Sequence, residues 1–360
     1  MSRFSIVYYI CGHGYGHAVR SIEILKALRA LSPGIALNIR TNAPRWLFSS
    51  LEPPVTFSAV QFESGVVQKN SFSVDVKATL ESAGNLLERL DELLDAEVTA
   101  LRRCPVDLIV SDINPFAFEV AQRIGVSGIA VGNFSWDWIF AGWVQRYPHY
   151  RFLIERFRFA YRKAALLLRL PFHGDMEVFS RIEDIPLVGR RSARSPHPIR
   201  RALDPGVSGR RLVFLPLRDD DLSRIQWQRV GRIENIQFLT LSQRFKAPNL
   251  IRYSDETVPF EDLLAASDAV ICKPGYGIVS ECLLNRTPIV YVPRRDFIED
   301  GVLRAALRRH AVSRALPVAD FNRGEWQRTL DLLWSEKKPW PEFHNDGARA
   351  AAQVLLGHCE

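Results

Sequence analysis

Three features are missing from this sequence: an apolar run long enough to cross a bilayer, a Cys-x-x-Cys pair and a low-complexity tail. A membrane-spanning helix needs about 20 consecutive apolar residues. The apolar run near the N-terminus is short and has no cleavage site, so it reads as a first strand rather than a signal peptide. The five cysteines have spacings unrelated to a zinc site. We therefore expect a cytoplasmic protein without a transmembrane segment or structural metal.

Negative charge is in the minority, since the formal net charge is +7 and arginine supplies most of the excess. A basic surplus is compatible with nucleic acid, an anionic membrane surface or anionic small molecules as partners. The arginines gather over 151–169, 190–211 and 294–309, and no nucleic-acid-binding signature accompanies them. We expect no nucleic-acid partner, and peripheral contact with a membrane remains open. The basic region 147–170 is predicted to be an amphipathic helix that packs inside.

The first strand, predicted over 4–10, runs into a glycine- and histidine-rich loop. Apolar residues then recur at helical spacing, which predicts a helix over 18–31. The loop reads G-x-G-x-G rather than the G-x-G-x-x-G of dinucleotide-binding proteins, and Arg40 and Asn42 stand where an acidic ribose ligand is expected. No Gly-Lys-Ser/Thr follows, so a phosphate-binding P-loop is also excluded.

Two histidines in this loop, His13 and His17, suit proton transfer because the imidazole titrates close to neutrality. His17 is either a catalytic base or a residue that caps the helix or orients a ligand. Asp112 ends another predicted strand, over 107–110, where functional groups of parallel sheets gather. By this position it is a candidate functional group, or it caps the helix predicted over 116–124.

The stretch from 265 to 300 has the pattern of a β-loop-α-β unit. A strand over 269–272 precedes a glycine turn, a helix over 278–285 and a second strand over 288–293. The unpaired amides and partial positive charge of a helix N-terminus make it an anion site. Gly275 and Gly277 would let the backbone approach a ligand closely. Without further information, a generic α/β crossover explains this pattern as well.

This stretch resembles the donor-nucleotide motif of GT-B glycosyltransferases. It is similar to the motif of the lipid II-forming N-acetylglucosaminyltransferase, with the family 28 C-terminal domain, and of UDP-glycosyltransferases. Four segments also resemble, in order, the N-terminal, glycosyltransferase-like half of L-arabinokinase-type proteins, and this likeness extends over nearly the whole chain. They are Gly12-His13-Gly14-Tyr15-Gly16-His17-Ala18-Val19-Arg20, Ser111-Asp112-Ile113-Asn114-Pro115, Asn133-Phe134-Ser135-Trp136-Asp137, and Lys273-Pro274-Gly275-Tyr276-Gly277-Ile278-Val279-Ser280-Glu281.

The resemblance implies an α/β protein of the GT-B class, with two Rossmann-like domains that face a central cleft. We expect an acceptor domain over 1–188, a linker over 189–211, a donor domain over 212–335 and, over 336–360, a helix at the domain junction.

For the donor domain, the resemblance implies that the glycine turn and helix start hold the diphosphate and that Glu281 holds the ribose. Glu299 and Asp300 would contact the sugar, and Val258 and Phe260 the base. The complete set of implied donor contacts is Lys273, Gly275, Tyr276, Gly277, Ile278, Val279, Glu281, Val258, Phe260, Arg218, Glu299 and Asp300.

For the acceptor domain, the resemblance implies that His17 activates an acceptor hydroxyl and that Asp112 orients it. From their positions and residue types, the expected acceptor or cleft contacts are His13, Gly14, Gly16, Arg20, Trp136 and Asp137. Arg20 could meet an anionic group or could nearly as well be a surface residue, and Trp136 is favoured as a core residue. A further apolar pattern predicts one long helix over 78–103.

The sequence departs from the family where many GT-B enzymes have a glycine-rich loop. Here Arg218 is followed by the acidic triplet 219–221. We interpret the triplet as a helix start rather than a metal site, with Arg218 as a substitute cation. The expected function is metal-independent sugar transfer, of the hexosyltransferase type, from a nucleotide sugar such as a UDP-sugar to an acceptor, with no cofactor. A sugar-nucleotide epimerase and a non-catalytic sugar-nucleotide-binding protein are the alternatives.

Overall fold

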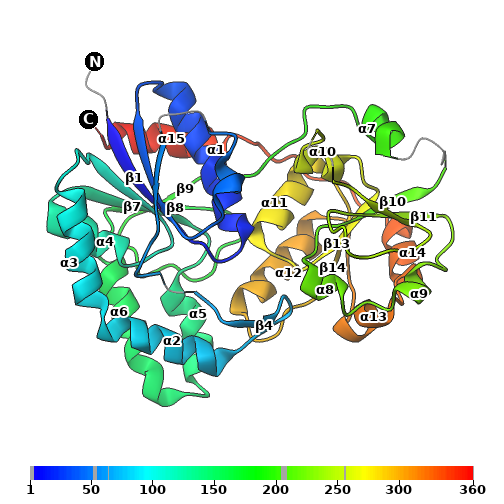
Figure 1. Ribbon diagram of the computed structural model, residues 1–360, viewed down its shortest axis with the longest axis horizontal. Helices are drawn as coiled ribbons and strands as arrows, with labels where there is room; N and C mark the ends of the chain where they lie inside the picture. Colours follow the sequence, from blue (N-terminus) through cyan, green and yellow to red (C-terminus); the bar gives the residue numbers. More distant parts are fainter. Residues whose placement is uncertain (1–3, 52–54, 64, 204–208, 255–256, 360) are drawn as a thin grey trace.

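The computed structural model describes residues 4–51, 55–63, 65–203, 209–254 and 257–359. Within them, the strands form two parallel sheets that lie side by side, and a short antiparallel pair lies between them (Figure 1). Helices cover both sheets, so the α/β class expected from the sequence is confirmed.

The N-terminal sheet has the strand order β3-β2-β1-β6-β7-β8-β9. Its strands are β1 (Ser5–Ile10), β2 (Ala36–Thr41), β3 (Val55–Ser58), β6 (Leu108–Asp112), β7 (Ser127–Gly132), β8 (Leu166–Arg169) and β9 (Ile182–Asp184). The helices in this half are α1 (Tyr15–Leu31), η1 (Arg45–Phe48), α2 (Val76–Glu88), α3 (Leu90–Leu101), α4 (Ala117–Ile124), α5 (Trp136–Val144), η2 (Pro148–Tyr150) and α6 (Arg151–Tyr161).

Strand β1 lies near the middle of this sheet and is buried along its whole length. Side chains buried on both faces are what a β-branched and aromatic run such as this one predicts. The single helix predicted over 78–103 is wrong, because α2 and α3 are separate. The chain leaves helical geometry at Arg89, with φ −110° and ψ 4°, and each of the two helices buries an apolar stripe of its own.

The C-terminal sheet has the order β12-β11-β10-β13-β14-β15. Its strands are β10 (Arg211–Leu215), β11 (Ile236–Thr240), β12 (Leu250–Arg252), β13 (Ala269–Cys272), β14 (Ile289–Tyr291) and β15 (Ser313–Ala315). The helices around it are α8 (Asp219–Leu222), α9 (Trp227–Val230), α10 (Phe260–Ala265), α11 (Tyr276–Asn285), α12 (Ile298–His310), α13 (Val318–Arg323) and α14 (Gln327–Ser335).

Several segments join the two halves. Helix α11, drawn in yellow in Figure 1, lies at the junction and contacts α1. The last helix, α15 (Gly347–Gly357), returns to the N-terminal half and packs on α1. The antiparallel pair β4 (Gln68–Asn70) and β5 (Ser73–Val74) reaches from the N-terminal half toward α12 (Figure 1). The segment between the sheets includes a helix, α7 (Pro196–Leu203); the exact domain limits stay a prediction.

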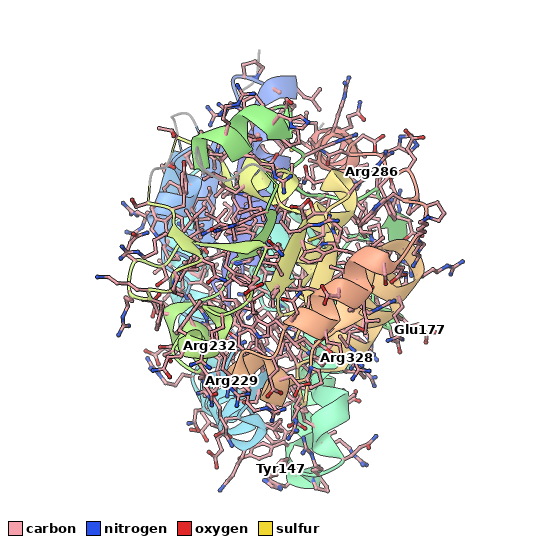
Figure 2. All side chains as sticks on the ribbon, turned by 90° about the vertical axis from the view of Figure 1, so that its right-hand side faces the viewer. Tyr147, Glu177, Arg229, Arg232, Arg286 and Arg328 are labelled. Atoms are coloured by element: carbon pink, nitrogen blue, oxygen red, sulfur yellow. The ribbon has the colours of Figure 1, made fainter. Side chains whose placement is uncertain are left out.

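Surface arginines are spread over the C-terminal half. Figure 2 shows Arg286 at one end of this surface and Arg229 and Arg232 at the other, and all three are exposed. In the described part of the chain, no helix combines the length and the apolar character needed to span a bilayer.

Candidate active site

Helix α1 begins directly after the glycine- and histidine-rich loop. Gly14 is the N-cap residue and adopts φ 84°, a conformation that glycine reaches at little cost. No side chain caps the helix. The alternative that His17 caps α1 is therefore wrong, and His17 lies in the first turn with its side chain 14% exposed.

His17 and Asp112 are in contact. Asp112 lies opposite Ile10 in the β1–β6 register, so both loops leave the same edge of the sheet. His17 Nδ1 is 2.8 Å from Asp112 Oδ1. Arg20 Nη2 also lies 3.0 Å from Nδ1. The carboxylate favours the tautomer with the proton on Nδ1, which leaves Nε2 as the acceptor. Asp112 does not cap the following helix, because Asn114 Oδ1 accepts the hydrogen bond from the Phe116 amide.

Arg20 completes this cluster, and the structure corrects both expectations for it. Arg20 is buried, 2% exposed, and is neither a surface residue nor a free anion contact. It donates to Asp112 Oδ2 from Nε at 2.7 Å and to Asp112 Oδ1 from Nη2 at 2.5 Å. Ser21 Oγ donates to the same carboxylate at 3.0 Å. Burial alone would raise the pKa of Asp112. The charges and hydrogen bonds of Arg20 and His17 outweigh this effect and hold the pKa well below its ordinary value.

His13 differs from His17 in its surroundings. Burial, together with the nearby charges of His17, Lys273 and Arg218, lowers the pKa of His13 to about 4. It is therefore neutral near pH 7. Its loop is fixed by Glu63, which accepts from the Gly12 amide at 2.5 Å and from Asn42 Nδ2 at 2.8 Å. Sequence reasoning missed Glu63, which lies in a segment without a clear pattern.

A cavity of about 310 Å³ lies beside this loop. It opens between the segment around Gly65, where an added Cβ would lie 3.0 Å from His13 Nδ1, and helices α2 and α3. Its lining residues are Gln61, Glu63, Gly65, Ser82, Ala83, Asn85, Leu86, Arg89 and Leu93. The lining is mixed, with amide, carboxylate, hydroxyl and guanidinium groups among aliphatic side chains.

The glycine turn of the C-terminal half leads into α11 with its N-terminal amides uncapped. Gly275 is the N-cap residue, without a side-chain cap, and the first turn has no acidic residue. First-turn amides lack an intrahelical acceptor, and here they belong to Tyr276, Gly277 and Ile278. The expectation that Val279 contacts the donor is wrong. Its amide donates to Gly275 O within the helix at 3.0 Å, and its side chain is buried.

Lys273 lies two residues before the N-cap of this helix and brings a positive charge to it. Its amine has no hydrogen-bond or ion-pair partner among the described residues. Burial, followed by the charges of Arg294 and Arg218, lowers the pKa of Lys273 to about 8. The two halves also meet here, since a Cβ added at Gly277 would lie 3.2 Å from Gly16 Cα.

Glu281, expected to face a ribose, is covered. Its side chain is 3% exposed, and Arg190 donates to Oε1 from Nε at 2.6 Å and to Oε2 from Nη2 at 3.2 Å. Burial raises the pKa of Glu281, against the opposing effect of Arg190. The Arg190 guanidinium also lies 4.9 Å from the ring centre of Phe260, one of the two expected base contacts. The other, Val258, donates its amide to Tyr253 Oη at 2.7 Å.

The pair expected to contact the sugar is also buried. Arg294 donates from Nη2 to Glu299 Oε2 and from Nε to Asp300 Oδ1, each at 3.1 Å. Glu299 Oε1 accepts from Asn133 Nδ2 at 2.9 Å, and Asn133 Oδ1 accepts from Arg20 at 2.8 Å. A continuous polar chain therefore joins this pair to Asp112 in the other half.

Arg218 contacts the hairpin of the N-terminal half. It donates to Ser71 Oγ at 2.8 Å and to Gln68 Oε1 at 3.0 Å. The next residues form helix α8, as expected for the acidic triplet, but Asp221 is buried and accepts from the Ser71 amide at 3.3 Å. Phe72 lies in the core of the C-terminal half. The sequence showed no signal for this docking, because β4 and β5 are too short for a periodic pattern.

Two of the expected acceptor contacts lie elsewhere. Trp136 is 2% exposed and belongs to the core of the N-terminal half. Asp137 is buried and pairs with Arg158, whose Nε lies 3.1 Å from Asp137 Oδ2. Neither contacts the His17 cluster, because they begin helix α5 and its packing turns them inward.

No family model matches this chain. L-arabinokinase of Arabidopsis thaliana is 31% identical over 97% of the chain, which spans about a third (34%) of that protein. Among solved structures, the calicheamicin glycosyltransferase CalG4 superposes with a TM-score of 0.62 at 14% identity, over 100% of this chain and 96% of that one. UGT89C1 of Arabidopsis thaliana, complexed with UDP, superposes with a TM-score of 0.62 at 15% identity, over 99% of this chain and 95% of that one. The protein therefore has the GT-B fold of glycosyltransferases. The lipid II and family 28 resemblances stay predictions.

Proposed function

We propose that the protein transfers a sugar from a UDP-sugar, in the first instance a UDP-hexose, to a hydroxyl group of an acceptor. The observation that supports this most is the approach of two sites from opposite halves. The His17–Asp112 pair lies in the first turn of α1 and at the end of β6, and Gly16 touches Gly277 in the first turn of α11. A proton acceptor and an anion site thus meet at the domain junction, as transfer between two substrates requires.

In the proposed reaction, His17 Nε2 takes the proton of the acceptor hydroxyl as the hydroxyl oxygen bonds to the sugar. The bond between the sugar and the diphosphate breaks, and the diphosphate leaves with the electron pair. Asp112 stabilises the imidazolium that forms, as the carboxylate does in a catalytic triad. Arg20 holds Asp112 ionised and in place. It is a positioning residue.

The leaving diphosphate is held, in this proposal, by the amides at the start of α11 and by Lys273. Fixed donors aimed at developing negative charge supply a large share of the stabilisation in such reactions. Arg218 and Arg294 act on Lys273 through their charge and add to the positive potential. The reaction then uses no metal ion and no cofactor.

The acceptor is proposed to enter the cavity next to the His13 loop. This cavity lies in the N-terminal half, and Gly65 on its wall lies close to the His13 ring, since an added Cβ would be 3.0 Å from His13 Nδ1. Its polar lining favours an acceptor with several hydrogen-bonding groups. The proposed location in the cell is the cytoplasm, since all five cysteines are free thiols, which suits a reducing compartment.

Release of UDP from UDP-hexoses, measured with and without a panel of hydroxyl acceptors, tests this function. We expect acceptor-dependent UDP release, lowered by His17→Ala by about two to four orders of magnitude. His197→Ala changes an exposed histidine in α7 and should leave the rate unaltered. UDP release without an acceptor would point to epimerase chemistry.

A non-catalytic sugar-nucleotide-binding protein is the second candidate. It is favoured by one observation, the occupation of Glu281 by Arg190. Binding of UDP-sugars without any release of UDP would identify it.

A further inference from the structure

Arg190 lies where the nucleoside of a bound donor is expected. Its guanidinium contacts both oxygens of Glu281 and lies over the ring of Phe260. These are the residues that the family resemblance assigns to the ribose and the base. Arg190 comes from the segment between the two sheets, and neither sequence pattern nor resemblance pointed to it.

Arg190 and a ribose cannot use Glu281 at the same time. The carboxylate is 3% exposed, and the atoms that cover it belong in part to Arg190 and to Gly189. A Cβ added at Gly189 would lie 3.4 Å from Glu281 Cγ and 3.2 Å from Ser280 Oγ, so the segment packs closely on α11. A ribose hydroxyl reaches Glu281 only after the guanidinium has moved.

A second carboxylate, that of Glu261, remains beside Arg190 when its guanidinium releases Glu281. Glu261 Oε2 lies 3.5 Å from Arg190 Nη1, and its side chain is 22% exposed. Glu281 is the buried partner and Glu261 the more accessible one. A guanidinium that releases Glu281 and stays paired with Glu261 keeps its charge compensated, so its movement does not leave a buried unpaired cation.

The backbone next to Arg190 is anchored, which confines the movement to the side chain. Asn285 Nδ2 donates to Arg190 O at 2.9 Å, and Asn285 Oδ1 accepts from the Ser192 amide at 2.8 Å. Ser192 Oγ donates to Asp262 Oδ1 at 2.6 Å. The segment therefore stays attached to α10 and α11 while the guanidinium changes partner.

We propose that Arg190 gates the nucleoside half of the donor site: it occupies Glu281 and Phe260 in the free protein and must release them before a nucleoside diphosphate binds. This inference rests on the proposed function, because it concerns the same donor site. It predicts that the diphosphate half, at Lys273 and the start of α11, is accessible without any movement of Arg190.

Two probes separate the halves of the site: pyrophosphate, which fits only the diphosphate half, and UDP, which needs both. Titration calorimetry of Arg190→Gln should give a Kd for UDP about ten- to a hundredfold lower than that of the unaltered protein, because a charge-assisted pair no longer has to be broken. The Kd for pyrophosphate should not change. Arg194→Gln, a neighbouring arginine that pairs with Asp262 instead, should leave both values unchanged.

Removing Arg190 alone leaves Glu281 buried without a cation, and this variant can unfold. The double variant Arg190→Gln/Glu281→Gln avoids the unpaired charge, and the amide oxygen still accepts from a ribose hydroxyl. It should bind UDP more tightly than Glu281→Gln alone. A lower UDP affinity without Arg190, or UDP and pyrophosphate affinities that change together, would contradict the gating role of Arg190. Neither outcome would contradict the proposed donor site. No binding of UDP or pyrophosphate by any of these proteins would remove the proposed function as well.

Discussion

Replacing Asp112 by asparagine tests the cluster around His17 most directly. The carboxylate is fully buried and accepts hydrogen bonds from His17, Arg20 and Ser21. Asparagine keeps the shape but loses the charge, and it turns one acceptor oxygen into a donor that faces the Arg20 guanidinium. Breaking a buried ion pair by removing one partner costs about 3–5 kcal/mol of the free energy of unfolding. That is a large part of the roughly 5–15 kcal/mol of a folded domain.

Urea unfolding followed by circular dichroism measures this loss, and an exposed pair supplies the control. Asp184 accepts from Arg169 at 2.6 Å with its side chain 67% exposed. Asp184→Asn should cost no more than about 1 kcal/mol, because water screens the pair. If Asp112→Asn costs as little as Asp184→Asn, the buried cluster does not stabilise the fold as argued. Arg20→Met added to Asp112→Asn should recover part of the loss by removing the unpaired cation.

The stabilisation from Asp112 also has a definite pH dependence. Because the pKa of Asp112 is lower in the folded protein than in the unfolded chain, its contribution is complete above the unfolded value of about 3.9. It is lost as the pH falls through the lower, folded value. The difference in stability between the unaltered protein and Asp112→Asn should therefore be present above about pH 4 and narrow below it. Widening of this difference on acidification would contradict the assignment.

Two further predictions concern the junction of the two halves. Because the pKa of Lys273 is about 8, the affinity for UDP should fall as the pH rises above that value. Lys273→Met should bind UDP weakly and without this pH dependence. Calorimetry at several pH values checks both expectations. Gly277→Ala would place a Cβ 3.2 Å from Gly16 Cα and should lower the free energy of unfolding by about 1–3 kcal/mol through overpacking. Gly275→Ala is the control, because a Cβ added there has no neighbour within 4 Å. Equal losses of stability for the two variants in urea unfolding would contradict a close approach of α1 and α11.

The contact between His17 and Asp112 was expected from the family resemblance, and local patterns together with one general rule agree with it. Each residue follows a recognisable strand, and the carboxyl ends of parallel strands lie at the same edge of a sheet. The neighbouring positions of β1 and β6 then bring the two loops together. The catalytic role of the pair is a separate matter and stays a proposal.

The partners of the arginines could not be predicted in the same way. Arg20 is 92 residues from Asp112, and Arg190 is 91 residues from Glu281. An arginine on a predicted helix turn or in a polar segment resembles a solvated residue, and only the placement of distant segments shows that it is buried. Trp136 illustrates the reverse case, since an aromatic residue next to a carboxylate suits a sugar contact equally well until its helix is seen to pack inward.

Under the proposed function, the buried polar chain between the halves would make the donor and acceptor sites interdependent. Arg20 contacts Asp112 and Asn133, Asn133 contacts Glu299, and Glu299 contacts Arg294. Separating the halves at the Asn133–Glu299 contact would expose buried groups that now satisfy one another, and a partly satisfied buried network is costly. Any movement that admits a donor sugar at Glu299 must therefore provide Asn133 with another partner, and a sugar hydroxyl can be that partner. The orientation of the base at His17 would then depend, through Arg20, on whether the donor sugar is bound.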